Sequence, residues 1–253
     1  MNDMVAKLFG DIEIVVIESP YDTLGDPEVR DLFSRLAALK IEGYRAVYEY
    51  GVLPVDTYDF VATHYLVCRK NQGRPEILTG YKTVTLQKCL KHRLVFPGMA
   101  LLRSAGATSH CLALEELLGQ FAANPDKVSY SSSWTINPEV RKNPALKNLL
   151  KDLMTVMLAA HELEIGTVER LGCGVPKVKS DQYFQSLGYQ RMTYRGDILP
   201  PFSQPSLVGE SAVLLHGTEY TEEALRVVER YRDFWQARRI FRPSDAAIEK
   251  KAA

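Results

Sequence analysis

The sequence has no excess charge of either sign and few cysteines. Lysine plus arginine and aspartate plus glutamate each number 31 in 253 residues, so the formal net charge is zero. A protein with this balance is not expected to bind nucleic acid or anionic membranes generally, because such binding would need a local patch. The four cysteines, Cys68, Cys89, Cys111 and Cys173, have no paired metal-ligand spacing. They predict reduced intracellular thiols rather than a metal site.

Long apolar runs and internal repeats are also lacking. No apolar stretch approaches the roughly 20 residues of a membrane-spanning helix, and the N-terminus has no basic region followed by an apolar signal core. We therefore expect a cytoplasmic protein. The apolar fraction of 46% is ordinary for a globular fold, and the length suits one large domain or two small ones.

Hydrophobic periodicity predicts a mixed α/β order of elements. Strands are expected at residues 12–18, 59–69, 77–86, 128–136, 167–172, 190–194 and 206–215. Helices are expected at residues 26–50, 112–123, 144–163, 179–187 and 222–241. This order favours antiparallel hairpins in the first half and a strand–helix–parallel strand unit in the second.

The segment from Ile136 to Leu150 carries the strongest functional signal. An apolar strand ends near Pro138, passes through a basic turn, and enters a long helix. The first turn of a helix has unbonded N–H groups and a partial positive charge, which suit a phosphate. Arg141, Lys142 and Lys147 add full charges there. The segment predicts a phosphate-bearing partner, although an exposed basic turn would look the same.

This segment resembles the cofactor motif of GNAT-type N-acyltransferases in Pro138, Arg141, Leu149 and Leu150. Residues 181–189 resemble the short helix and Gly-aromatic turn that close the same fold. The resemblance implies a mixed, mostly antiparallel central sheet flanked by helices, with two central strands splayed apart. It also implies that an acyl thioester lies between those strands. The donor-binding residues would be Trp134, Thr135, Ile136, Arg141, Lys142, Asn143, Ala145 and Lys147.

Two positions depart from the GNAT pattern. The two glycines that let the family's backbone approach a pyrophosphate are replaced by Pro144 and Leu146, which remove an N–H donor and add a side chain. The family often uses a tyrosine in the closing helix as general acid toward the leaving thiolate. Phe184 stands at that position and Tyr183 precedes it, about 100° away around the helix. These departures leave open a binding protein without catalytic activity.

The first half is similar to one subgroup, the acyl-homoserine-lactone synthases and N-acyl amino acid synthases. Arg45 lies in a basic-aromatic segment, Asp56 and Asp59 follow three residues apart, and Lys82 stands where the subgroup has arginine. Lysine keeps the charge but not the planar two-pronged grip on a carboxylate. The resemblance implies that Arg45 and Lys82 bind the acceptor substrate. It also implies a donor held by acyl carrier protein or coenzyme A.

The acids allow two interpretations. Asp56 and Asp59 can hold an acceptor ammonium group or take its proton, and Glu139 can serve the amine in the same way. Aspartates also cap turns before strands, which would give Asp56 and Asp59 a purely structural role. A tryptophan at a position such as Trp134 is more often simply a core residue than part of a donor site. Cys173 fits a packed residue better than a nucleophile, since no helix start or base adjoins it.

Metal binding is not predicted. His161 and Glu164 share a helix face, but two ligands do not make a zinc site. The proline-rich loop at residues 197–205 is consistent with a flap, a hinge or a plain linker.

The sequence therefore predicts an N-acyltransferase that moves an acyl group from acyl carrier protein or acyl-CoA to the amine of a small molecule, such as an amino acid derivative. The alternative is a catalytically inactive GNAT-fold binding or regulatory protein. Residues 1–205 are expected to form the acyltransferase domain, and residues 206–253 to complete or extend it with a strand and a helix. The charged helix at 222–241 is expected to be solvated, and it could also dock a partner. The oligomeric state is not predicted.

Overall fold

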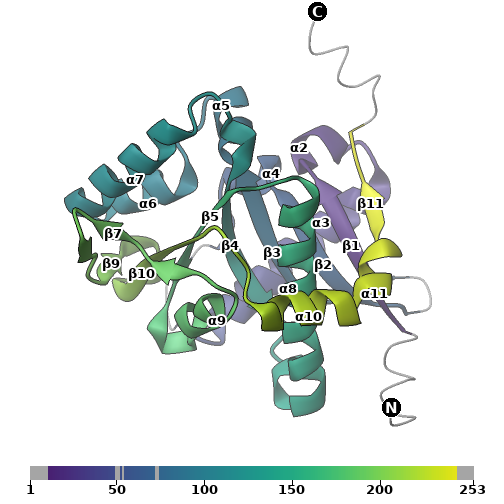
Figure 1. The fold of residues 1–253 in the computed structure, drawn as a ribbon. Helices are drawn as coiled ribbons and strands as arrows, with labels where there is room; N and C mark the ends of the chain where they lie inside the picture. Colours follow the sequence, from purple (N-terminus) through teal and green to yellow (C-terminus); the bar gives the residue numbers. More distant parts are fainter. Residues whose placement is uncertain (1–10, 49–51, 53, 72–73, 244–253) are drawn as a thin grey trace, which may run out of the picture.

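A computed structural model describes residues 11–48, 52, 54–71 and 74–243. Their main feature is one large, mostly antiparallel sheet with strand order β11-β1-β2-β3-β4-β5-β10-β6 (Figure 1). The main strands are β1 (Ile12–Glu18), β2 (Thr63–Arg69), β3 (Glu76–Thr85), β4 (Val128–Ile136), β5 (Glu169–Gly174) and β10 (Glu210–Gly217). Two pairs run parallel, β4 with β5 and β1 with β11 (Arg239–Phe241). The predicted fold class is confirmed.

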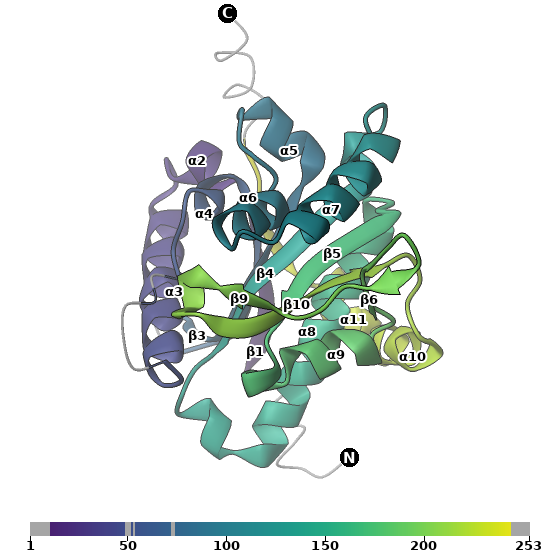
Figure 2. The ribbon, with the colours of Figure 1, turned by 90° about the vertical axis from the view of Figure 1, so that its left-hand side faces the viewer.

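Helices cover both faces of the sheet because its strands alternate apolar side chains between them (Figure 2). On β1, Ile14 and Val16 pack toward α8 (Pro144–Glu164), whereas Val15 and Ile17 pack toward α3 (Pro27–Arg45). The α8 face also carries α9 (Ser180–Ser186), α10 (Glu222–Arg230) and α11 (Arg232–Gln236). The α3 face also carries α5 (Leu86–Lys91), α6 (Pro97–Ser104) and α7 (Thr108–Gln120).

The remaining elements are short. They are α2 (Pro20–Thr23), α4 (Tyr58–Val61), β6 (Gln190–Arg191), β7 (Thr193–Tyr194), β8 (Asp197–Ile198) and β9 (Phe202–Gln204). Within the described ranges, no helix combines the length and apolar character that crossing a bilayer requires.

Several predicted boundaries are confirmed. β1 and β4 occupy the predicted ranges, and α8 ends one residue later than expected. The predicted N-cap of α3 is present, since the Asp26 carboxylate accepts a hydrogen bond from the Glu28 amide at 2.8 Å. The predicted end of this helix near Tyr50 lies outside the described residues, and the described helix ends at Arg45.

Other predictions were wrong. The strand expected at residues 59–69 begins only at Thr63, because α4 occupies Tyr58–Val61. The helices α5 and α6 were missed. The helix expected over residues 222–241 breaks after Arg230, and its last part is the edge strand β11. β11 extends the sheet beside β1, where Val15 is paired with Arg239. The strand expected at 206–215 runs from Glu210 to Gly217, and the proline-rich loop contains β8 and β9.

Candidate functional site

The central parallel strands β4 and β5 separate part-way along their length. They pair from Val128 with Glu169 up to Ser131 with Gly172, and no pairing to β5 is found among the described residues for the rest of β4. A β-bulge lies just beyond this point. Gly80 is opposite Thr135 and Lys82 is opposite Ser132, so two residues of β4 oppose one of β3. A bulge bends its strand, which takes the end of β4 away from β5.

The bulge depends on a left-handed residue. Ser133 has φ of 59°, a region that L-amino acids other than glycine enter rarely. Trp134 follows it and turns its ring toward the α8 face, where it belongs to the core on that side. The predicted splayed strands are therefore present, and their separation begins beside the second of the three consecutive serines of β4.

Two aromatic rings meet across the separated ends. The ring centroids of Trp134 on β4 and Tyr183 on α9 are 4.8 Å apart. Trp134 Nε1 donates a hydrogen bond to Thr79 Oγ1 at 3.1 Å. The Tyr183 hydroxyl lies 2.9 Å from Thr155 Oγ1 on α8, and burial raises its pKa. Because this hydroxyl is buried and already bonded, Tyr183 is poorly placed to protonate a leaving thiolate. Its ring packs against Trp134 at the separated strand ends.

The start of α8 offers fewer backbone donors than the sequence suggested. Pro144 has no N–H, and the Leu146 amide is capped by the Asn143 side chain at 3.2 Å. The Lys147 amide bonds the Asn143 carbonyl at 2.9 Å. Within the part of the chain that the structure describes, the Ala145 amide is the one donor of this first turn without an acceptor. An anion at this position would depend mainly on side chains.

The side chains around this helix start are mostly exposed. Lys142 pairs with Glu139 at 2.8 Å, and both are largely in solvent. Arg141 is half-buried, and burial lowers its pKa. Asn143, Ala145 and Lys147 are exposed. The predicted catalytic acid Glu139 therefore lies with the predicted phosphate-binding residues, not with the two aspartates.

The remaining residues predicted to bind the acyl donor, Thr135 and Ile136, point away from the space between β4 and β5. A Cβ added to Gly43 of α3 would come within 2.1 Å of Thr135 Oγ1, so the Thr135 side chain is packed against α3. Ile136 lies in the core under α8. The side chains of Thr135 and Ile136 thus do not line the space between β4 and β5.

Asp56, Asp59 and Lys82 form a charged cluster with Lys40 on the α3 face. Lys82 Nζ lies 2.6 Å from Asp56 Oδ1 and 2.8 Å from Asp59 Oδ2. Lys40 Nζ contacts Asp59 Oδ1, and the Asp56 amide donates to Asp59 Oδ2 at 2.8 Å. Because Lys82 is paired in register with Ser132, the cluster lies beside the point where β4 and β5 separate.

Burial divides the two aspartates. The Asp59 side chain is 2% exposed, whereas that of Asp56 is 50% exposed. Burial disfavours the ionised Asp59, but the ammonium groups of Lys40 and Lys82 outweigh it and hold the pKa of that carboxyl well below its usual range. Burial lowers the pKa of Lys40 to about 8 despite its pairing with Asp59. Asp59 is thus enclosed as a counterion, and Asp56 is the carboxylate that a solute can reach.

Two neighbours complete the cluster. His64 Nε2 lies 2.6 Å from the Asp59 carbonyl oxygen, and burial together with the nearby Lys40 charge lowers the pKa of His64 to about 3, so it is neutral. Burial, and then the neighbouring Tyr48, raise the pKa of Tyr44 on α3. Arg45, at the end of α3, is exposed.

Sequence reasoning missed Lys40, Tyr44 and the roles of His64 and Tyr183. The sequence pattern could have indicated Lys40, because this residue continues the buried stripe of α3 that includes Leu32, Leu36 and Leu39. A lysine in such a stripe needs a buried counterion. Across the described residues, no group of three or more histidine, cysteine, aspartate or glutamate side chains could hold a metal ion.

Two solved structures with a similar architecture are acyl-transferring synthases. FeeM, an N-acyl amino acid synthase from uncultured soil microbes, has a TM-score of 0.54 at 12% identity, over 88% of this chain and 94% of its own. BjaI, a CoA-dependent acyl-homoserine lactone synthase with SAM and isopentyl-CoA, has a TM-score of 0.51 at 13% identity, over 96% of this chain and 100% of its own. This chain has the GNAT fold in the form of those synthases. The resemblance to this subgroup is confirmed at the level of the fold.

The two sequence comparisons find no relative. No protein-family model matches the chain, and no curated protein matches its sequence. At 12–13% identity the structural likeness concerns the fold, and the chemistry must be argued from this chain's own residues.

Proposed function

We propose that the protein is an N-acyltransferase that transfers an acyl group from a thioester to the amine of a small molecule. The observation that carries the proposal is the coincidence of two features. The strands β4 and β5 part after Ser131 and Gly172, and the half-exposed Asp56 carboxylate lies in the charged cluster beside that point. Separated strands can receive an extended thioester, and a reachable carboxylate can receive an amine.

In the proposed reaction the amine nitrogen attacks the thioester carbonyl carbon. The C–N bond forms, the C–S bond breaks, the amine gives up a proton, and the thiolate takes one. Asp56 would hold the ammonium group and, as a general base, take one proton from it, which frees the nitrogen lone pair for the attack; the proton that the nitrogen loses after the attack ends on the thiolate. A backbone N–H of β4 near the bulge would polarise the carbonyl oxygen.

Lys82, Asp59 and Lys40 would act as positioning residues. Lys82 is almost fully buried and already bonds both carboxylates, so it is better suited to hold Asp56 in place than to grip a substrate carboxylate. Arg45 remains a candidate for binding the acceptor from the exposed end of α3.

The donor would lie along the aromatic pair of Trp134 and Tyr183, with its phosphate near the start of α8. Arg141, Lys142 and Lys147 would supply the charges, and the Ala145 amide one hydrogen bond. Both acyl-CoA and acyl carrier protein carry a phosphopantetheine phosphate, so this arrangement suits either donor.

The test is a transfer assay with acyl-CoA and acyl carrier protein against a panel of amines. Thiol release is followed optically, and the amide product by mass spectrometry. Asp56→Asn should abolish most product formation while leaving acyl-CoA binding intact. No amide product from either donor, with any amine, would exclude the enzyme.

A binding protein of the same fold is the second candidate. The scarcity of free amides at the start of α8 and the engaged Tyr183 hydroxyl favour it. Tight binding of acyl-CoA without turnover, insensitive to Asp56→Asn, would identify this alternative.

A further inference from the structure

A buried carboxylate interrupts the apolar face of α8. Glu162 is 1% exposed and belongs to a buried stripe of this helix whose members are otherwise apolar, apart from Thr155. Burial raises the pKa of Glu162 to about 7, and a buried carboxyl group destabilises a fold unless it is hydrogen-bonded. About 27 Å of helix separates Glu162 from Pro144, where the donor phosphate is proposed to lie. Its role must therefore be sought in its partners.

One oxygen of Glu162 is shared by two serines of β4. Ser129 Oγ donates a hydrogen bond to Glu162 Oε1 at 2.9 Å, and Ser131 Oγ makes a longer and weaker one to the same atom at 3.5 Å. The two serines are two positions apart, so their side chains lie on one face of the strand. Ser131 Oγ also lies 2.8 Å from Oγ1 of Thr83, its paired residue on β3. The carboxylate thus ties β4 to α8 and, through Ser131, to β3.

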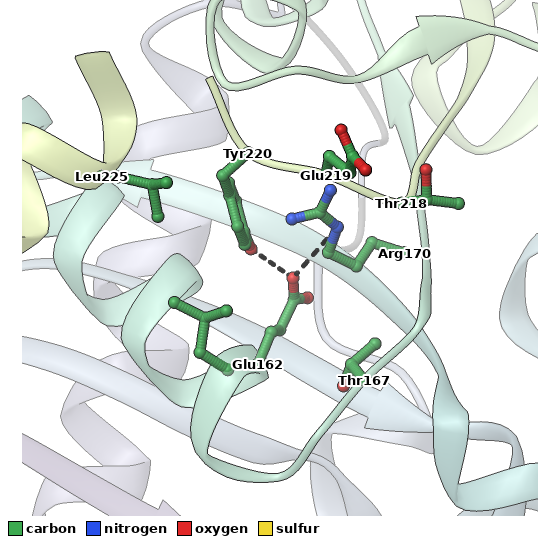
Figure 3. A pocket seen from close by; sticks show the side chains of 8 residues that line it. Glu162, Thr167, Arg170, Thr218, Glu219, Tyr220 and Leu225 are labelled. Carbon is green, nitrogen blue, oxygen red and sulfur yellow. Dashed lines mark hydrogen bonds and ion pairs between the residues drawn. The ribbon is translucent and has the colours of Figure 1, made fainter. Parts of the chain in front are cut away.

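The other oxygen of Glu162 faces the turn between β10 and α10 (Figure 3). The Tyr220 hydroxyl donates to Glu162 Oε2, and Arg170 Nε lies 3.9 Å from the same atom. Arg170 Nε donates instead to the Gly217 carbonyl at 3.0 Å. Glu162, Arg170 and Tyr220 line a cavity of about 330 Å³ at the end of α8. This side of the carboxylate has no bond to β4, so it can be altered separately from the serine side.

The two serines lie immediately before the distorted part of β4. Ser131 is the last β4 residue that is paired with β5 in the described chain, and the bulge follows Ser132. Ser133 has the left-handed φ of 59°. A strained backbone persists only where the contacts around it over-determine its shape. The β4 anchor, formed by Glu162, Ser129 and Ser131, fixes the strand directly before this strain.

We propose that Glu162 is a positioning residue for the proposed acyl transfer. By holding Ser129 and Ser131 it sets the direction in which β4 leaves β5. It thereby sets the position of the backbone N–H that would polarise the thioester carbonyl. Glu162 acts through β4 and touches neither the donor nor the acceptor. This role rests on the proposed function, whereas the hold of the β4 anchor on the bulge is measurable without any substrate.

Hydrogen exchange tests the β4 anchor alone. Ser129→Ala removes its shortest bond and is a small change that should fold. The amides of residues 132–135 should then exchange about tenfold faster than in the wild type. Glu162→Gln keeps a carbonyl oxygen for Ser129 and should exchange there at nearly the wild-type rate. Tyr220→Phe removes only the bond to the other carboxylate oxygen, so it is the matched control and should leave these amides unchanged. Unchanged exchange in Ser129→Ala, or an equal rise in Tyr220→Phe, would overturn the proposal.

Steady-state kinetics with acyl-CoA test the positioning role. Ser129→Ala should lower kcat about tenfold, whereas Glu162→Gln and Tyr220→Phe should stay within about twofold of the wild type. The KM for acyl-CoA should change little in all three variants, because the phosphate end of the donor is bound elsewhere. An equal loss of kcat in Ser129→Ala and Tyr220→Phe would indicate a merely structural role and refute the positioning, as would an unchanged kcat in Ser129→Ala. Absence of product from the wild type would refute the proposed function and this role with it, and hydrogen exchange separates that failure from a failure of the β4 anchor.

Discussion

Replacing Asp59 by asparagine should destabilise the protein far more than the same change at Asp56. Asp59 is enclosed and is the counterion of two buried ammonium groups. Asparagine fills the same space but leaves Lys40 charged and unpaired in the interior, while Lys82 keeps Asp56. Removing one partner of a buried ion pair costs about 3–5 kcal/mol. Asp56 is half-exposed, so its replacement should cost about 1 kcal/mol or less.

The size of the Asp59→Asn effect should depend on pH. In the wild-type fold, burial already lowers the pKa of Lys40 to about 8, and loss of its counterion lowers it further. The unfolded chain then binds more protons than the folded variant at neutral pH, so the variant becomes more stable as the pH rises. The difference from wild type should be largest near pH 6 and smaller at pH 9, where Lys40 is mostly neutral in both proteins.

Urea denaturation at pH 6 and pH 9 measures both effects as a shift of the midpoint at constant slope. The double variant Lys40→Met with Asp59→Asn is the control, because it removes the unpaired charge and should regain much of the lost stability. A cost below about 1 kcal/mol for Asp59→Asn at pH 6, no larger than that of Asp56→Asn, would refute the reasoning. Asp59 would then be open to solvent and free to act on a substrate.

Three further predictions concern other parts of the molecule. Arg141→Ala should raise the KM for acyl-CoA by about tenfold and leave that for phosphate-free acyl-pantetheine unchanged in steady-state assays, since only acyl-CoA presents a phosphate. Burial raises the pKa of Glu162 to about 7, above its unfolded value, so its contribution to the free energy of unfolding falls by roughly 3 kcal/mol between pH 4.5 and 7. Denaturation of Glu162→Gln over this pH range should show that this fall is gone. A fall as large as in the wild type would contradict the raised pKa of Glu162. Gly43→Ala should lower the free energy of unfolding by about 1–3 kcal/mol, because the added methyl group would push α3 away from Thr135. Gly119→Ala on α7, which has open space around it, should leave the stability in thermal denaturation unchanged or raise it.

Local signals explain which elements could be predicted. β1 contains an unbroken β-branched run from Ile14 to Ile17, and α8 has a capping asparagine, a first-turn proline and a long apolar stripe. α6 was missed because Phe96-Pro97-Gly98 resembles a loop, although proline fits the first turn of a helix. β11 depends on pairing with β1, more than 220 residues earlier, and no local pattern reveals such a partner.

Only part of the candidate site could be predicted from the sequence, because long-range packing decides the rest. The sequence placed Asp56, Asp59 and Lys82 in one functional group through a family resemblance, and the structure brings them into contact. The sequence could not show which of the two aspartates is buried, because their burial depends on Lys40 of α3, a helix that packs on them from elsewhere in the chain. Long-range packing, and not the spacing of the acids, makes one of them a counterion and leaves the other accessible.

The choice between catalysis and binding depends on how the donor is held and how it is released. The first turn of α8 offers one free amide, so most of the affinity for a phosphate would come from side-chain charges, which salt screens. Because the Tyr183 hydroxyl is bonded to Thr155 and is poorly placed to protonate the thiolate, departure of a poor leaving thiol would be slow, and a better one would leave faster. If the protein is an enzyme, turnover should therefore rise with the acidity of the leaving thiol. If it is a binding protein, donor affinity should fall with salt while turnover is absent for every thiol.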